Sequence, residues 1–176
     1  MTDFIYSEVQ RCLKKYGTRN PYEFLASMKV VFRETTRYPE NGLKGFCMIM
    51  FGTMYVTVNA NLDDVLKKTT TAHEGAHIIV HRNVILSNAT KMMKDFDIFN
   101  ASGRYENEAN FFVADYLLDD NDVMEIITDG DMDYFKTAKV LCIPAPLLDF
   151  KLYSMMRRGF AVKNVDGLNS RFLGTK

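Results

Sequence analysis

The sequence predicts an α+β fold, in which a small antiparallel sheet packs on a long helix and a mainly helical part follows. Three observations support this class. Apolar residues recur at helical spacing near the N-terminus, two short apolar runs separated by Gly-Thr lie within residues 45–58, and helical spacing dominates from residue 61 onward. The chain of 176 residues has room for one compact domain with a small appended subdomain.

The N-terminal part is expected to contain helices and strands in turn. Residues 3–16 carry apolar side chains at helical spacing, with a glycine at the end. A second helix over residues 20–28 begins with Asn-Pro, an N-cap followed by a proline at the first helical position. We expect three strands, at residues 29–33, 45–51 and 54–58. The last two are expected to form a hairpin.

The remainder is expected to be helical. A long helix covers residues 61–81, and a polar stretch at residues 87–100 connects it to a second long helix at residues 102–118. Shorter helices follow at residues 122–128, 133–141 and 146–157.

The composition excludes several classes of protein. Lys plus Arg and Asp plus Glu number 22 each, so no overall positive field exists to attract nucleic acid or anionic lipid. No apolar run approaches the roughly 20 residues that span a bilayer, and the first residues do not resemble a secretory signal, so we expect a cytoplasmic protein without membrane association. Cys12, Cys47 and Cys142 form no paired motif and are expected to be buried free thiols.

The clearest indication of chemistry is an HExxH sequence, His73-Glu74-Gly75-Ala76-His77, inside the long helix. The two histidines lie about 40° apart around the helix axis, so both imidazoles leave one face and can bind one tetrahedral ion. Glu74 is rotated off that direction and is placed to take a proton from a metal-bound water. The alternative is a pair of core histidines that are hydrogen-bonded to neighbours.

A third metal ligand is expected on the second long helix, because a catalytic zinc usually takes three protein ligands. Glu106 lies about 50° from the centre of that helix's apolar stripe, so its carboxylate points inward and needs a cation or donors. The alternative for Glu106 is an ion pair with Arg104, Arg82 or a lysine. Glu108 lies more than about 100° from the stripe and is expected to be a solvated surface charge.

Other polar residues receive lesser roles. His81 competes as third ligand, but successive turns of a straight helix cannot easily place three imidazoles around one ion, so we expect it to cap the helix or to hydrogen-bond a ligand. Asp115 faces away from the apolar stripe and is expected at the surface. The group that stabilises the oxyanion stays open among Tyr105, Tyr116, Tyr153 and His81.

The residues together predict a zinc-dependent endopeptidase. His73, His77 and Glu106 would hold the zinc ion, and a water would take the fourth position. Glu74 would act as general base and pass the proton to the leaving amine.

The two motifs resemble those of the ImmA/IrrE family of zinc metallopeptidases. HEGAHxxxH, from His73, and ENEANFFVADYLL, from Glu106, are similar to the family patterns HExxHxxxH and E-x-x-A-x-x-F-A-x-x-L-L. The resemblance extends over most of residues 16–157 and implies that the first Glu of the second motif completes the metal site, in agreement with the helix geometry. Two positions depart from the family patterns: Gly75 replaces the usual bulky residue after the glutamate of HExxH, and Val113 replaces the usual alanine of the second motif. Neither change removes a metal ligand.

The resemblance also implies a fold and a substrate. It implies a zincin-like metallopeptidase domain over residues 1–130, followed by a helical, helix-turn-helix-like subdomain over residues 131–176. An edge strand beside the active-site helix would pair with the substrate backbone, and residues 54–58 are the candidate, with an internal hairpin strand as the alternative. Similar family members cleave helix-turn-helix transcriptional repressors and so derepress mobile-element or stress-response genes.

A non-catalytic role competes with hydrolysis. The same fold would serve as an antirepressor that sequesters a repressor without cleavage, although an intact HExxH and an inward Glu106 weigh against it. Direct DNA binding is not expected, because the last helix offers only Lys151 before Arg157 and Arg158.

Overall fold

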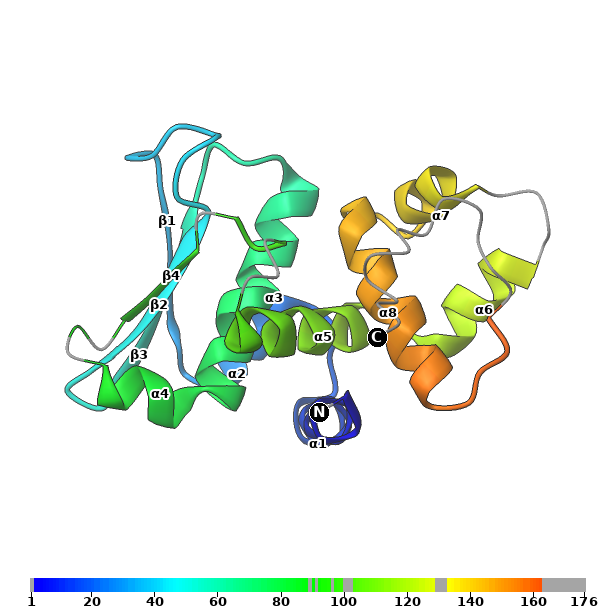
Figure 1. Cartoon of the computed structure of the whole chain (residues 1–176). Helices are drawn as coiled ribbons and strands as arrows, with labels where there is room; N and C mark the ends of the chain where they lie inside the picture. The colour runs from blue at the N-terminus through cyan, green and yellow to red at the C-terminus, as the bar shows by residue number, and fades with distance from the viewer. Residues whose placement is uncertain are drawn as a thin grey trace.

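A sheet lies at one side of the molecule, two helices cross its centre, and three further helices form the other side (Figure 1). The computed structural model describes residues 2–88, 90, 92–95, 97–99, 103–128 and 133–162, and it confirms the predicted α+β class. In chain order the elements are α1 (Thr2–Tyr16), α2 (Pro21–Ser27), β1 (Val31–Thr35), β2 (Gly45–Met50), β3 (Thr53–Asn59), α3 (Asp64–Val80), α4 (Arg82–Ser87), β4 (Met92–Asp95), α5 (Arg104–Leu117), α6 (Asp120–Thr128), α7 (Tyr134–Val140) and α8 (Ala145–Arg157).

The sheet has the strand order β1-β3-β2-β4. β2 and β3 form the predicted antiparallel hairpin, while β1 runs parallel to β3 and β4 antiparallel to β2. β3 therefore lies inside the sheet, and the prediction that residues 54–58 form an edge strand is wrong. The edges are β1 and β4.

β4 was not predicted, because its four residues lie within the polar stretch assigned to a connection. Among the strands that the structure describes, β4 pairs with β2 alone, in a register that sets Asp95 opposite Gly45 and Met93 opposite Cys47. Pairing with a strong neighbouring strand overrides the weak local preference of so short a segment. The consequence is that Asp95 is held beside α3.

Local sequence explains where the helices begin and how α3 is seated. The side chains of Asn20 and Asp63 accept hydrogen bonds from backbone N–H groups in the first turns of α2 and α3. α3 packs on β2 and β3 and on α2. Gly75 faces α2 so closely that a Cβ there would lie 3.2 Å from Leu25 Cδ2, which explains a glycine in the middle of a helix.

A polar network joins α5 to α8. Asp115 is 2% exposed and accepts hydrogen bonds from Lys151 Nζ at 3.1 Å and Ser154 Oγ at 2.6 Å. The predicted surface position of Asp115 is therefore wrong, because α8 covers the face of α5 that points away from α3. Lys151, itself 1% exposed, is not available to contact a nucleic-acid phosphate.

Three further expectations concern the whole chain. Cys12 and Cys47 are buried as predicted, but Cys142 is exposed. No helix in the described ranges is both long and apolar enough to cross a membrane. Residues 163–176 lie outside the described part, and the division of the chain near residue 130 stays a prediction.

Candidate metal centre

The two histidines of the HExxH sequence point from α3 toward α5. His73 and His77 are both fully buried, and their Nε2 atoms lie 3.0 Å apart. Their separation by four residues on a regular helix produces this arrangement, as the sequence predicts. Two ring nitrogens at this distance can bind one ion.

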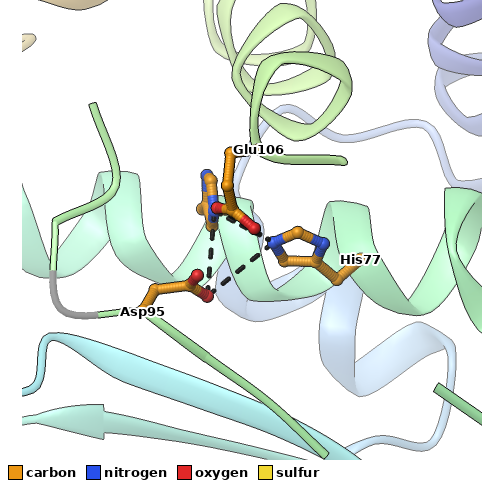
Figure 2. A group of neighbouring side chains, drawn as sticks. His77, Asp95 and Glu106 are labelled. Carbon is orange, nitrogen blue, oxygen red and sulfur yellow. Dashed lines mark hydrogen bonds and ion pairs between the residues drawn. The ribbon is translucent and has the colours of Figure 1, made fainter. Parts of the chain in front are cut away.

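Glu106 reaches the same point from the first turn of α5, as Figure 2 shows. Its Oε2 lies 3.1 Å from His73 Nε2 and 3.7 Å from His77 Nε2, and its side chain is 23% exposed. The structure thus brings together the three residues that the sequence proposes as metal ligands. Arg104 does not pair with Glu106, since it donates to Glu108 Oε1 instead.

Asp95, at the end of β4, is a fourth member that the sequence analysis missed (Figure 2). Its Oδ2 lies 3.8 Å from His73 Nε2 and 3.7 Å from His77 Nε2. The residue is 5% exposed, and Oδ2 has no hydrogen-bond donor in the described residues. Burial raises the pKa of this carboxyl to about 6. No local pattern pointed to Asp95, because its position depends on pairing between β4 and β2.

Asn110 orients the first histidine. His73 Nδ1 lies 3.1 Å from Asn110 Oδ1, and Asn110 Nδ2 donates to the backbone oxygen of Ile98. An amide oxygen can only accept, so the proton of the neutral ring resides on Nδ1 and the lone pair of His73 Nε2 faces the cluster. The sequence signal was available, because Asn110 follows Glu106 by four residues on the same helix face.

A hydrogen-bonded chain orients the second histidine. His77 Nδ1 lies 2.9 Å from His81 Nδ1, and His81 Nε2 lies 3.0 Å from Glu108 Oε2. The carboxylate of Glu108 fixes the proton of His81 on Nε2, so His81 Nδ1 accepts from His77 and the Nε2 of His77 keeps its lone pair. His81 therefore acts on a ligand and stays outside the cluster. Glu108 is 6% exposed, which makes the prediction of a solvated surface charge wrong.

Glu74 lies on the sheet side of the cluster and is fully buried. Neither of its carboxylate oxygens has a hydrogen-bond partner in the described residues, and the Asp95 carboxyl and the Cys47 thiol are its polar neighbours. Burial, reinforced by the Asp95 carboxyl, raises the pKa of Glu74 well above its usual range. The ionised form of a carboxyl with a raised pKa is a stronger base than an ordinary carboxylate.

The donor set fits a divalent metal ion. Burial lowers the pKa of His77 to about 4, so its imidazole is neutral and able to ligate. Asp95 and Glu106 supply carboxylate oxygens, and Asp95 Oδ2 is otherwise an orphaned buried atom. Nitrogen and oxygen donors of this kind suit zinc and related transition metals.

The tyrosines proposed for the oxyanion differ in position. Tyr116 is excluded, because its hydroxyl donates to backbone oxygens of Thr18 and Asn20 far from the cluster. Tyr153 contacts Phe111. The ring of Tyr105 lies beside that of His81 in a tilted arrangement, with ring centroids 5.0 Å apart, and Tyr105 immediately precedes Glu106 in the sequence.

Comparisons with known proteins agree with the geometry. The family model described as the IrrE N-terminal-like domain, Peptidase_M78, matches residues 18–153. "Uncharacterized immunity region protein 2" of Bacillus phage phi105 is 31% identical over 116 residues, which cover 66% of this chain and 69% of that protein. No solved structure matches the chain. Because the family match includes both motifs and most of the described fold, this chain belongs to the IrrE N-terminal-like, or ImmA/IrrE, family.

Proposed function

We propose that the protein is a zinc-dependent endopeptidase. His73, His77 and Glu106 would hold the metal, and Glu74 would serve as the general base. The observation that supports this most strongly is the convergence of three ligand atoms, 3.0 to 3.7 Å apart, beside a buried carboxyl without a partner. Membership of a peptidase family supports the same reaction class.

The choice of zinc rests on the ligand types, since two histidines and a glutamate are a known set for catalytic zinc. When bound, zinc supplies a Lewis acid that polarises a carbonyl and lowers the pKa of a coordinated water toward about 7. Glu74 then accepts the proton of the attacking water on a carboxylate oxygen and transfers it to the leaving amine. Its raised pKa favours this role, because a more basic carboxylate is a better proton acceptor.

The proposed substrate is a helix-turn-helix repressor in the cytoplasm. This follows from the motif resemblance, and the name of the phage relative, which refers to an immunity region, is compatible with it. Hydrolysis of such a repressor would relieve repression of the genes that it controls.

Metal analysis and one substitution test the proposal. We expect purified protein to contain one zinc per chain, and Glu74→Gln to retain zinc and repressor binding but to lose cleavage. Glu125→Gln, an exposed carboxylate on α6, is the matched control and should cleave like the wild type. Cleavage is followed by mass spectrometry of a candidate helix-turn-helix repressor incubated with the protein.

The same experiment identifies the competing function. If Glu74→Gln and the wild type remove the repressor from its operator equally well, with the repressor intact in both cases, the protein acts by sequestration and the peptidase proposal is refuted.

A further inference from the structure

Four potential ligand atoms surround one point in this site. In a tetrahedral site with metal–ligand bonds near 2.0 to 2.1 Å, neighbouring ligand atoms lie about 3.3 Å apart. The distances among the Nε2 atoms of both histidines and Glu106 Oε2 are 3.0, 3.1 and 3.7 Å. Asp95 Oδ2 lies 3.7 and 3.8 Å from the same two nitrogens. Asp95 thus stands near the fourth corner, which a catalytic water would otherwise take.

The hydrogen-bond directions show why a cation belongs among these atoms. The Nδ1–H of His73 donates a hydrogen bond to Asn110 Oδ1, and the Nδ1–H of His77 donates one to His81 Nδ1. In the tautomers that carry the ring proton on Nδ1, both Nε2 atoms are acceptors, and they face two carboxylate oxygens that are acceptors too. Buried acceptors that converge without a donor are costly, and a cation at their centre satisfies all of them.

From this geometry we infer that Asp95 is a fourth protein ligand, so that the metal-loaded chain rests with a closed site and β4 must shift before water and substrate reach the metal. The inference rests on the proposed function, since it requires the metal to bind at this site. Metal sites with four protein ligands are typically structural, whereas catalytic sites keep one position open. Asp95 would thus hold the peptidase in a latent state.

β4 is suited to such a shift. It is an edge strand of four residues that pairs with β2 alone among the described strands, and beyond this ladder the backbone N–H of Lys44 donates to the backbone oxygen of Asp95 at 2.8 Å. Its other edge carries no strand in the described part of the chain. A partner that binds along β4 or displaces it would therefore change the position of Asp95 directly.

Cobalt substitution tests the inference on the full chain. Co²⁺ in place of zinc gives visible absorption bands that change with the ligand set, and acetohydroxamate is a small probe that binds an open metal position. We expect Asp95→Ala to change the bands and to lower the half-saturating acetohydroxamate concentration about tenfold or more, because a closed site reduces apparent affinity by the fraction of open molecules. Asp97→Ala, which removes an exposed carboxylate two residues away, should resemble the wild type.

The outcomes separate this inference from the proposed function. If wild type and Asp95→Ala show the same bands and the same acetohydroxamate response, Asp95 is not a ligand and the inference is refuted. If Asp95→Ala does not fold, Asp95→Asn replaces it and is held to the same criterion. A chain that takes up neither Co²⁺ nor Zn²⁺ refutes both proposals. A site that opens in Asp95→Ala without any repressor cleavage supports the role of Asp95 and refutes the peptidase function alone.

Discussion

Gly45 controls the space available to Glu74, and replacing it by alanine is the most informative structural test of the site. An added Cβ would lie 2.6 Å from Glu74 Oε1 and 2.8 Å from Thr70 Cγ2. Both neighbours are fully buried side chains of α3, and the β-branched Thr70 has little rotamer freedom in a helix. The Glu74 carboxyl must therefore move, or β2 must separate from α3.

The size of the effect follows from the overlap. Overpacking of a buried position by one methyl group typically costs about 1 to 3 kcal/mol. For a chain of this length such a loss lowers Tm by about 2 to 12 °C. A displacement of the general base by about 1 Å lowers kcat/KM on the order of 100-fold, while zinc content is retained because the ligand side chains are unchanged.

Thermal unfolding, zinc analysis and repressor cleavage measure the three effects in Gly45→Ala. Gly75→Ala is the matched control, because the same change occurs next to Glu74 but its Cβ would meet Leu25 Cδ2 at 3.2 Å and ring atoms of Phe24 at 3.5 and 3.7 Å, and not the Glu74 carboxyl. Alanine gains about 1 kcal/mol over glycine within a helix, which offsets part of this close contact, so cleavage by this control should stay near the wild-type level. Wild-type Tm and full cleavage in Gly45→Ala would refute the close approach of β2 to Glu74.

Three further predictions concern the surroundings of the site. Lys151→Met should lower the free energy of unfolding by about 1.5 to 3 kcal/mol in urea titrations, because Asp115 and Asp120 lose a buried charged donor and keep Ser154 and Arg158, whereas the exposed Lys136→Met should change it little. Glu108→Ala should weaken zinc binding about 10- to 100-fold in chelator competition, because it removes the acceptor that orients His81, and unchanged affinity would contradict the hydrogen-bonded chain. Burial would raise the pKa of Asp120, but hydrogen bonds from Arg158 and Lys151 outweigh it and lower that pKa. The ion pairs of Asp120 therefore stabilise the fold fully above the pKa of an unfolded aspartate, near 4, and this contribution is lost as the pH falls through the lower pKa of the folded state. The urea concentration at the unfolding midpoint should fall between about pH 4 and pH 2, and a constant midpoint over this range would contradict the prediction.

Periodicity and spacing predicted most of the architecture. Most of the helices, the β2–β3 hairpin and the cap at Asn20 follow from signals within a few residues of each other, whereas the short helix α4 was not predicted. The meeting of His73 and His77 follows likewise from one turn of helix geometry. Local patterns predict these features well because local backbone geometry determines them.

The features that were missed depend on contacts between distant segments. β4 forms because β2 offers it a partner, and Asp95 reaches the cluster only through that pairing. The internal position of β3 follows from its parallel pairing with β1, for which the sequence carries no signal of its own. Neither could be obtained from hydrophobic spacing within one segment.

The errors at Glu108 and Asp115 have one physical origin, which also explains how the metal site is supported. The sequence analysis treated α5 as a helix with one apolar stripe and one solvated face. In the structure α3 covers one side of α5, and α1 and α8 cover others, so every residue from Glu108 to Tyr116 is buried. Polar residues on such a helix must find partners, and α5 consequently supplies Glu106 to the metal cluster, Glu108 and Asn110 to the histidines, and Asp115 to α8. The rigidity of this one central helix therefore couples the position of the proposed third ligand to the orientation of the other two.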